Sequence, residues 1–365
     1  MSQKKRRVGV IFGGRSGEHE VSLMSARSVL DAIDKDRYEV VPIGITKTGR
    51  WLPPARAQRL LTGEAPSAVQ DAEGQSSAVL APTQRSSMVV GSLGGALGEP
   101  LDVVFPVLHG PYGEDGTMQG FLDLANIPYV GAGVLGSALG MDKGKMKEVW
   151  RYHGLPVVDW TVLRRFQWRE DRDACLREAS RFGFPCFVKP ANLGSSVGIG
   201  KAHDAAELPA CIEEALRHDE KVIVEEFVDG REIEVAVLGN HKPEASIPGE
   251  IVPSNEFYDY NAKYLDGKSE ERIPAPLPSD IAERVRELAV KAFTALECSG
   301  MGRVDFFVTR LGNEVLLNEI NTIPGFTPIS MYPKLWAATG LPYDRLIDRL
   351  IELAIERWEE RNQNL

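Results

Sequence analysis

Short apolar runs alternate with an amphipathic stretch over the first third of the chain. Val8–Phe12, Tyr38–Ile45 and Leu101–Leu108 are apolar runs of strand length, and Ser22–Ile33 carries its apolar residues at helical spacing. Strands that alternate with helices predict a parallel sheet with helices packed on it. Residues 53–100, rich in Ala, Gly, Ser and Pro, interrupt this pattern and are interpreted as a surface insertion without chemistry.

A second group of elements follows from about residue 132. The predicted elements are a helix at 142–153, strands at Cys186–Lys189 and Val197–Lys201, a helix at Ala205–Arg217 and a strand at Lys221–Val228. Asp204 and Glu207 have the spacing of a capping pair at the start of the second helix. Asp229-Gly230, between the last strand and the run Arg231–Leu238, predicts a tight hairpin.

The last third predicts a helix at Ile281–Ala295, two strands around a turn at Leu311–Asn313, and a closing helix at Leu346–Arg361. A polar loop from about residue 254 to 274 contains three tyrosines and a lysine. Such a loop suits a lid over a charged ligand, and a solvated surface loop is the alternative. The pattern predicts an α/β protein with three units, at residues 1–131, 132–228 and 229–365.

Composition narrows the classes of function. Of 365 residues, 43% are hydrophobic and 26% charged, as in a globular protein, and the net charge of −10 argues against broad nucleic-acid binding. The four cysteines lack zinc-like or Cys-x-x-Cys spacing and are interpreted as reduced thiols, typical of the cytosol. The apolar run after Arg7 is too short for a signal peptide, and no run approaches the ~18 residues of a membrane span.

Two carboxylates, an amide and an arginine lie on the strands beside the last turn. If the loop has an odd number of residues centred on Gly312, Asp305 lies opposite Glu319, and Arg303 lies opposite Asn321. Side chains alternate between the two faces of a strand, so these four groups share one face of the hairpin.

This hairpin face is a candidate metal site. Neighbouring acids repel each other unless a cation lies between them, and oxygen ligands from Asp305, Glu319 and Asn321 suit Mg²⁺, which usually also binds nucleotide phosphates. In the same register, Phe307 and Leu317 extend the face as an apolar floor. A surface hairpin with a cross-strand ion pair is the alternative.

A loop rich in glycine and serine follows the strand that ends at Lys189. Glycines let backbone N–H groups approach phosphates, Ser195 and Ser196 add donors, and Lys189 supplies positive charge. The loop lacks the Gly-Lys-Ser/Thr ending of a Walker A motif. Gly194-x-Ser196-x-Gly198 matches the hydrolase elbow, but a strand is predicted after the serine where an elbow needs a helix. A phosphate-binding loop is the preferred interpretation, and a plain turn is the alternative.

Two further loops follow strands of the first unit. The loop at residues 13–22 opens a helix at the carboxyl end of a strand, a frequent ligand position, but lacks the glycine spacing of dinucleotide-binding folds. Glu18 in this loop suits a substrate ammonium, and helix capping is the alternative. His109, which opens the other loop, is either a polar ligand contact or a hydrogen-bonded turn residue.

Five motifs in this order resemble the D-alanine–D-alanine ligases, within the ATP-grasp superfamily. They lie at residues 13–22, 108–116, 187–198, 257–264 and 302–325. The resemblance covers nearly the whole chain except residues 53–100. It implies an N-terminal parallel α/β domain followed by two ATP-grasp subdomains that hold the nucleotide between them. It also implies an enzyme that joins two D-alanines for peptidoglycan precursor synthesis, through a D-alanyl phosphate, with ADP and phosphate as products.

The resemblance also assigns residues to the nucleotide. Lys143 and Lys189 would contact the α and β phosphates, and Lys263 would reach the γ phosphate from the lid. The backbone of residues 225–228 would read adenine, and Glu232 would contact the ribose. Two Mg²⁺ or Mn²⁺ ions would be held by Asp305, Glu319 and Asn321. The other implied cofactor-binding residues are Ser195, Ser196, Glu225, Glu226, Phe227, Val228, Phe307 and Asn318.

For the amino-acid substrates, the resemblance places Glu18 on the ammonium of the first D-alanine, with His109 beside the pocket. Ser195 and Tyr264 would join Glu18 in a hydrogen-bonded chain that ties the loops together on closure. The remaining substrate residues fall near the end of the last motif. Arg303 and the N–H of Gly325 would stabilise the oxyanion of the tetrahedral intermediate, and the second substrate's carboxylate would be held by Ser330 and by the backbone of Met331.

The lid sequence differs from that of depsipeptide ligases, which favours D-alanine over D-lactate as second substrate. A D-alanine–D-lactate ligase or another ATP-grasp carboxylate–amine ligase is the near alternative. A catalytically silent ATP-binding sensor is the alternative from another class. The resemblance further implies a homodimer formed through the N-terminal domain and a cytoplasmic location, with no nucleic-acid or membrane partner.

Overall fold

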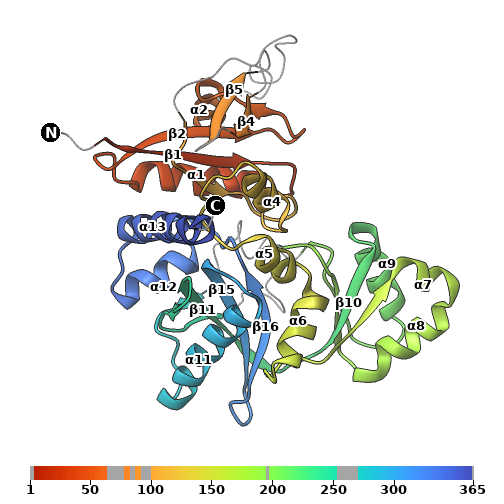
Figure 1. The fold of residues 1–365 in the computed structure, drawn as a ribbon. Helices are drawn as coiled ribbons and strands as arrows, with labels where there is room; N and C mark the ends of the chain where they lie inside the picture. Colours follow the sequence, from red (N-terminus) through yellow and green to blue (C-terminus); the bar gives the residue numbers. More distant parts are fainter. Residues whose placement is uncertain are drawn as a thin grey trace.

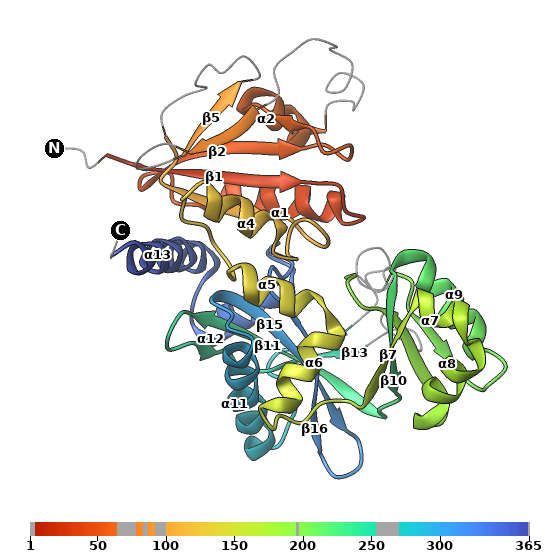
Figure 2. The same cartoon turned by 45° about the vertical axis from the view of Figure 1, so that its right-hand side comes forward.

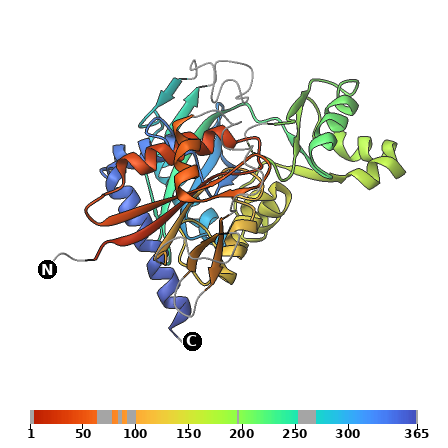
Figure 3. The same cartoon turned by 90° about the horizontal axis from the view of Figure 1, so that it is seen from above.

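A computed structural model describes residues 4–63, 78–82, 87–91, 100–194, 197–252 and 270–363 of the chain. These residues form three main sheets with helices around them and a separate two-stranded ribbon (Figure 1). Seen from above, the second sheet and its helices project to one side of the other two sheets (Figure 3). The α/β fold class expected from the sequence is confirmed.

The first sheet has the predicted parallel core. Strand β1 pairs in parallel with β2 and with β6, and β3 pairs antiparallel with β2 at one edge. The strands, in sheet order, are β3 (Trp51–Leu52), β2 (Tyr38–Ile45), β1 (Arg6–Gly13) and β6 (Val103–Val107). The helices of this unit are α1 (His19–Ala32), α2 (Pro54–Thr62) and α4 (Thr117–Leu124). The separate ribbon consists of β4 (Ala78–Pro82) and β5 (Ser87–Gly91).

Helix α2 corrects the predicted surface insertion at residues 53–100. Its Ala57 and Leu61 are buried in the same apolar cluster as strand β1. The two residues are four apart and lie on one face of the helix, which is the face that packs on the sheet. The start of the segment therefore belongs to the core. The helix was not predicted because the composition of the segment, rich in Ala, Gly and Pro, is typical of surface loops.

The second sheet is antiparallel throughout. Its strands, in sheet order, are β7 (Trp160–Arg164), β10 (Lys221–Glu226), β8 (Cys186–Pro190) and β9 (Gly200–Ala202). Its helices are α7 (Arg165–Glu170), α8 (Arg172–Ala179) and α9 (Leu208–His218), with a short 3-10 turn at Ser180–Phe182. Among the described residues, its apolar cluster draws on residues 163 to 224 alone, so this unit has a core of its own.

The third sheet carries the acidic hairpin. Its strands, in sheet order, are β14 (Glu270–Arg272), β13 (Gly249–Val252), β11 (Gly230–Gly239), β15 (Gly300–Thr309) and β16 (Val315–Asn321), with β12 (Glu244–Ala245) paired to β11. The helices around it are α5 (Val134–Met141), α6 (Lys143–Tyr152), α11 (Ser279–Ala295), α12 (Met331–Thr339) and α13 (Tyr343–Asn362). None of the described helices is long and apolar enough to cross a membrane.

Helix α13 lies between the first and third sheets (Figure 2). One apolar cluster contains Val10 and Phe105 of the first sheet, Met301 of the third, and Leu350 and Ile351 of α13. The last long helix of the chain therefore completes a core that belongs to both sheets.

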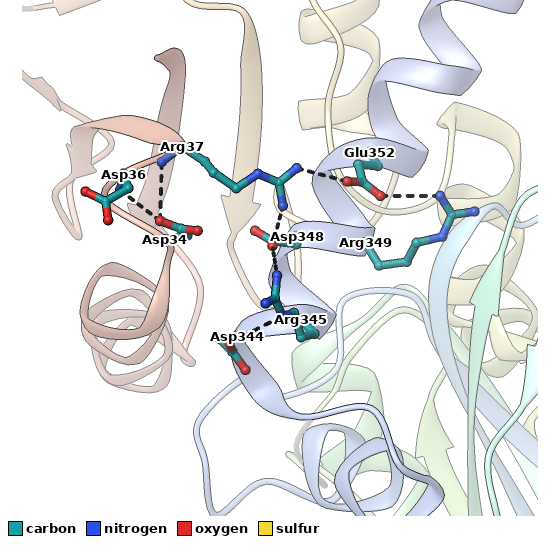
Figure 4. A network of polar contacts seen from close by, with 8 residues as sticks. All are labelled: Asp34, Asp36, Arg37, Asp344, Arg345, Asp348, Arg349 and Glu352. Carbon is teal, nitrogen blue, oxygen red and sulfur yellow. Dashed lines mark hydrogen bonds and ion pairs between the residues drawn. The ribbon is translucent and has the colours of Figure 1, made fainter. Parts of the chain in front are cut away.

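A polar network supports the same interface from its edge (Figure 4). Arg37, which precedes β2, donates to Asp348 at 2.5 Å and to Glu352 at 3.0 Å, both on α13. Further along α13, Arg357 donates to the Tyr129 carbonyl at 3.0 Å and to Ser299 Oγ at 2.5 Å. Charged side chains thus join the N-terminal unit to α13 at two places along the helix.

The hairpin predicted at Asp229-Gly230 is wrong. Strand β10 pairs with β7 and β8 in the second sheet, whereas β11 pairs with β12, β13 and β15 in the third. Val224 of β10 and Val235 of β11 are buried in different apolar clusters. Because burial of each strand in its own core outweighs the preference of two turn residues, the chain crosses between sheets here.

Two other predicted boundaries shift. The strand expected at Val197–Lys201 begins only at β9, because Gly198 has φ 71°, a left-handed conformation that does not fit an extended strand. Helix α9 begins at Leu208, three residues later than expected. Asp204 and Glu207 instead accept backbone hydrogen bonds within the turn that precedes it.

Candidate active site

The register predicted for the acidic hairpin is confirmed at its functional end. Asp305 pairs with Glu319, and Arg303 pairs with Asn321. The register then shifts at Phe306, which pairs with Leu317 and leaves one unpaired residue, Asn318, on strand β16. A β-bulge of this kind places the same acids opposite each other although the turn differs from the symmetrical one assumed from the sequence.

The bulge corrects the predicted apolar floor. Leu317 is fully buried in the cluster on the other face of the sheet, so it does not extend the acidic face. On the acidic face, Phe307 pairs with Leu316 and not with Leu317. The unpaired Asn318 lies at the site, where its Oδ1 is 3.4 Å from Lys189 Nζ. A bulge depends on contacts from the rest of the fold, and the turn sequence does not reveal it.

Arg303 shares the acidic face, as predicted. Its guanidinium donates two hydrogen bonds of 2.7 Å to Asp305 and lies 3.1 Å from Glu234 Oε2. Burial alone would lower the pKa of Arg303, but Asp305 and Glu234 outweigh it and raise that pKa well above its usual range. Asn321 donates to Asp305 Oδ2 at 3.0 Å.

Glu234 is a site residue that the sequence reading missed. It pairs with Asp305 across β11 and β15, so Glu234, Asp305 and Glu319 lie side by side on three neighbouring strands. The available signal was the spacing of two between Glu232 and Glu234, which places both on one face of β11. Within the described ranges, no three His, Cys, Asp or Glu residues form a group able to hold a metal ion. Mg²⁺ in proteins is usually held by one or two carboxylates together with other oxygen ligands, and the amide oxygen of Asn321 suits such a site.

Two lysines reach this face from different elements. Lys143, the first residue of α6, lies 3.2 Å from Glu319 Oε2 and donates to the Leu193 carbonyl at 2.9 Å. Lys189, on β8, lies 2.5 Å from Glu225 Oε2 on β10. The side chain of Asp142 caps the start of α6, which fixes the position of Lys143 as the first residue of the helix. The fold thus brings positive charge from α6 and from the second sheet to the acids of the third.

The segment predicted to hold adenine runs from the second sheet to the third. Glu225 and Glu226 end strand β10, and Glu226 accepts from the Asp159 N–H at 3.1 Å. Phe227 is 41% exposed, and its ring lies 6.3 Å from that of Phe187 on β8 and 4.8 Å from Lys201 Nζ. On the other side, Glu232 pairs with Phe307 across β11 and β15. An exposed aromatic ring beside a lysine suits stacking on a flat anionic ligand.

Glu18 lies just before helix α1, where two glycine loops approach it. A Cβ atom on Gly110 would come within 2.6 Å of Glu18 Oε2, and one on Gly194 within 3.2 Å. Ser16 Oγ accepts from the Glu18 N–H at 3.2 Å and donates to the His109 carbonyl at 2.6 Å. Glycine at both positions therefore lets the two loops close around one carboxylate.

His109 and Glu114 attach the loop of the first unit to the loop that follows β16. His109 is buried, with Nδ1 2.9 Å from the Ile323 carbonyl and Nε2 3.1 Å from Ser25 Oγ, and burial lowers its pKa. Glu114 accepts from the N–H groups of Gly110 at 2.8 Å and Ile323 at 3.3 Å. Burial and the nearby Glu18 raise the pKa of Glu114 to about 8. Both ring nitrogens of His109 thus contact the protein itself, and Glu114 is a second residue that the sequence reading left without a role.

The residues predicted for the second substrate's carboxylate lie at the start of α12. Ser330 is the N-cap of α12, Met331 is its first residue, and the N–H of Thr327 donates to Ser330 Oγ at 3.1 Å. A Cβ atom on Gly325 would come within 3.1 Å of the same Oγ. Backbone N–H groups at the start of a helix suit a carboxylate. Four predicted residues, Ser195, Ser196, Lys263 and Tyr264, lie outside the described residues, as does most of the predicted lid.

A cavity of about 350 Å³ adjoins the loops of the first unit. Its lining includes Ser16 and His109 on one side and Trp51, Met118 and Phe121 on the other. Residues of the acidic hairpin do not line it. The candidate site itself is defined by the converging loops and charged groups described above.

Comparisons with known proteins agree on one family. Residues 7–132 match the model for the D-ala D-ala ligase N-terminus, and residues 149–352 match the model for the D-ala D-ala ligase C-terminus. A D-alanine–D-alanine ligase from Natranaerobius thermophilus is 50% identical, over 99% of this chain and 98% of the relative. One from a Thermoanaerobacter species is 52% identical, over 98% of this chain and 99% of the relative.

Solved structures give the same result. The D-alanine–D-alanine ligase from Coxiella burnetii superposes with a TM-score of 0.85 at 39% identity, over 99% of this chain and 97% of that one. A D-Ala:D-Ser ligase from Enterococcus faecalis superposes with a TM-score of 0.84 at 37% identity, over 96% of this chain and 100% of that one.

Proposed function

The chain belongs to the D-alanine–D-alanine ligase family, and from this premise we propose that it joins two D-alanines to D-alanyl-D-alanine in an ATP-dependent reaction, for peptidoglycan precursor synthesis. A carboxylate and an ammonium do not condense in neutral water, so the acid must first be activated. The γ-phosphoryl group of ATP passes to the carboxylate of the first D-alanine, and ADP leaves. The amine of the second D-alanine then attacks this acyl phosphate, and phosphate leaves as the peptide bond forms.

One observation in this structure supports the proposal beyond membership of the family. Leu193 and Gly194 are neighbours in the glycine loop. Leu193 accepts from Lys143, which contacts Glu319, and the backbone of Gly194 approaches Glu18. A single loop therefore joins the carboxylate proposed for the substrate ammonium to the acids proposed for the phosphates. Reactions of this type depend mostly on holding the reactants together, which contributes ~7–11 kcal/mol of the barrier.

The phosphates are proposed to lie against Lys143, Lys189 and the acidic hairpin. Asp305, Glu319 and Asn321 offer oxygen ligands on one face, in register, which fits Mg²⁺ or Mn²⁺. When bound, such ions neutralise phosphate charge. In the structure, Arg303 and Lys143 supply the positive charge beside Asp305 and Glu319. The lysine of the lid, Lys263, is proposed to meet the γ phosphate.

The nucleoside is proposed to lie where the second sheet passes into the third. The backbone of residues 225–228 would read adenine, and Glu232 would contact the ribose. The exposed ring of Phe227 and the pairing of Glu232 with Phe307 support this placement. Asn318 would join the nucleotide residues because the bulge leaves it on the acidic face, beside Lys189.

The amino acids are proposed to lie between the first unit and the start of α12. Glu18 would take the ammonium of the first D-alanine, which suits a buried carboxylate in the loop between strand β1 and helix α1. Arg303 and the N–H of Gly325 would stabilise the tetrahedral oxyanion. Ser330 and the N–H of Met331 would hold the second carboxylate, and His109 would position the loops around it.

Ser195 and Tyr264 are proposed to complete a hydrogen-bonded chain with Glu18 on closure. We further propose domains at residues 1–131, 132–228 and 229–365, because each main sheet falls within one of these ranges. Helix α6, at the start of the middle range, packs on the core of the third sheet. A homodimer and a cytoplasmic location are part of the same proposal. The dimer is tested by light scattering after gel filtration.

The deciding experiment measures phosphate release from ATP with no addition, with D-alanine, L-alanine, D-serine or D-lactate singly, and with D-alanine mixed with D-serine or D-lactate, together with identification of the product. We expect release and dipeptide formation with D-alanine alone. Equal background release of phosphate in all arms would favour the alternative function, a catalytically silent ATP-binding sensor. Faster product formation with D-alanine plus D-lactate or D-serine at neutral pH would reassign the second substrate.

A further inference from the structure

Three charged side chains are buried where α6 meets the second sheet. Lys147 Nζ, on α6, lies 2.8 Å from Glu225 Oε1, and Lys189 Nζ lies 2.5 Å from Glu225 Oε2. Lys147 is 0% exposed and Glu225 is 2% exposed. We name these three residues the Lys–Glu–Lys cluster. Two ammonium groups share one carboxylate, so the cluster as a whole keeps one positive charge.

The pKa values show how strongly the three groups depend on one another. Burial raises the pKa of Glu225, but Lys147 and Lys189 outweigh it and lower that pKa to about 2. Burial lowers the pKa of Lys189, but Glu225 and Glu319 outweigh it and raise that pKa. For Lys147, burial outweighs Glu225 and lowers the pKa. The pKa of each member therefore depends on burial and on at least one other member of the cluster.

The two lysines of the cluster differ in what they can reach. Lys189 contacts Asn318 on the acidic hairpin, so its ammonium faces the proposed phosphate site. Lys147 has no exposed surface and lies one helical turn behind Lys143, which contacts Glu319. A nucleotide bound at the acidic face can touch Lys143 and Lys189, but Lys147 can act on it only through Glu225.

We propose that Lys147 is a positioning residue for ATP. Its ammonium holds one oxygen of Glu225, so that Glu225 orients Lys189 with the other oxygen and leaves net positive charge for the phosphates. This inference rests on the proposed ATP site and adds a residue to which neither the sequence motifs nor the site contacts assign a role.

The consequence of removing Lys147 follows from charge balance. Glu225 would then face Lys189 alone, and the pair would carry no net charge. A buried carboxylate with one unpaired oxygen also turns toward its remaining cation, which draws Lys189 away from the nucleotide. Removing the charge of Glu225 as well would restore one positive charge at Lys189. The two changes together should therefore do less harm to ATP binding than the first alone.

The test compares Lys147→Met with Lys147→Met/Glu225→Gln. We expect Lys147→Met to raise the KM for ATP and the Kd for ATP, measured by calorimetry, by about tenfold or more, as for loss of a close charge pair. The value of kcat should change by less than about threefold, and the KM for D-alanine should stay the same, because Lys147 touches neither substrate. The double variant should recover most of the lost ATP affinity.

The matched control is Lys145→Met on the same helix. Lys145 is exposed and pairs with Glu148 at 2.5 Å on the helix surface. The same substitution there should leave the Kd for ATP unchanged. ATP affinity in Lys147→Met equal to that of the control would overturn the proposal. So would a loss that the double variant does not relieve although circular dichroism shows both proteins folded, because a packing defect would behave that way.

A milder variant keeps the proposal testable if Lys147→Met does not fold. Lys147→Gln retains a hydrogen-bond donor for Glu225 without charge, and we expect it to weaken ATP binding in the same direction. An unchanged Kd for ATP in Lys147→Gln would also overturn the proposal. Failure of the ligase assignment is distinguishable, since a wild-type protein without D-alanine-dependent turnover would leave the ATP-binding comparison intact.

Discussion

The first and third sheets share one apolar core, whereas the second sheet has its own core and meets its neighbours through charges. Val10 of β1 and Leu350 of α13 lie in the same cluster, and α13 packs on both sheets. The second sheet meets α6 through the ion pair of Lys147 with Glu225 and through the contact of Lys221 with Asp142. Apolar packing with ion pairs at its edge joins the first pair of units, whereas ion pairs and hydrogen bonds join α6 to the second sheet.

This difference separates two halves of the site. The proposed substrate residues Glu18 and Ser330 belong to the two units that share a core, and His109 attaches their loops to each other. Lys189 belongs to the unit held by charges. We therefore expect the substrate half to keep a fixed geometry and the nucleotide half to adjust its position on binding, since polar interfaces between units allow relative motion.

The largest effect is expected on the acidic hairpin, at Glu319, which contacts Lys143 of α6. Replacing Glu319 by alanine should reduce turnover by about 10³-fold, because charge stabilisation on the transferred phosphoryl group is lost. Steady-state phosphate release measures this, and circular dichroism should show an unchanged fold. Glu314→Ala, at an exposed position in the turn of the same hairpin, is the control. Near-normal turnover in Glu319→Ala would remove this residue from the site.

The next test compares two buried leucines on helices. Leu350→Ala in the shared core and Leu208→Ala in the core of the second sheet should each cost about 2–5 kcal/mol of unfolding free energy, through lost burial and a cavity. Hydrogen exchange should then differ. Leu350→Ala should raise exchange in both the first and third sheets, whereas Leu208→Ala should raise it mainly in the second.

Uniform loss of protection in both leucine variants would break the comparison between the two interfaces. It would mean that the charged contacts of α6 couple the second sheet to the rest as tightly as an apolar core does. If Leu350→Ala lowered protection in the first sheet alone, the first and third sheets would not share one cooperative core, and the comparison would also fail.

Glu114 gives the shared interface a dependence on pH. Its pKa is raised from 4.5 to about 8, mainly by burial and then by Glu18. The unfolded chain therefore releases this proton at lower pH than the folded protein. The stabilising contribution is complete below about pH 4.5 and is lost as the pH rises toward 8, at up to about 1.4 kcal/mol per pH unit.

Glu114→Gln should remove this slope from the unfolding free energy between pH 5 and 8, measured by denaturant titration without ATP. The exposed Glu148→Gln is the control and should keep the slope. A wild-type protein that becomes more stable as the pH rises through this window, with no change in Glu114→Gln, would contradict the assignment.

The smallest effect is expected at the edge of the shared interface. Glu352 pairs with Arg37 at 3.0 Å, and both side chains are about two-fifths exposed. Replacing Glu352 by alanine should change the unfolding free energy by less than about 1 kcal/mol, because water screens exposed ion pairs. A larger loss than in Leu350→Ala would show that charges, rather than apolar packing, hold this interface.

The sequence predicted most elements whose apolar pattern is strong. Strand β2 begins and ends at the predicted residues, and the pairing of Asp305 with Glu319 was expected from alternation and a turn centre. Three predictions failed where tertiary contacts decide. The bulge at Asn318 moved Leu317 out of the site, the strands around Asp229-Gly230 joined different sheets, and α2 entered the core.

Three site residues escaped prediction for a common reason. Lys147, Glu234 and Glu114 are charged residues beside other charged residues in helical, strand or loop segments, where a solvated side chain is the usual outcome. Their importance comes from partners far away in the sequence, such as Glu225 for Lys147 and Ile323 for Glu114. One chain read alone does not reveal which distant groups meet, so charge burial of this kind became visible only in the fold.

The position of α13 has a consequence for how the protein is made. Strand β1 is synthesised long before α13, so the core around Val10 lacks Leu350 and Ile351 until residue 351 has been added. Domains usually fold as units in the order of their synthesis. Here the N-terminal unit remains partly uncovered during translation, while the second sheet, whose core ends at residue 224, can already close. During synthesis, the second sheet would therefore complete its core before the first sheet does.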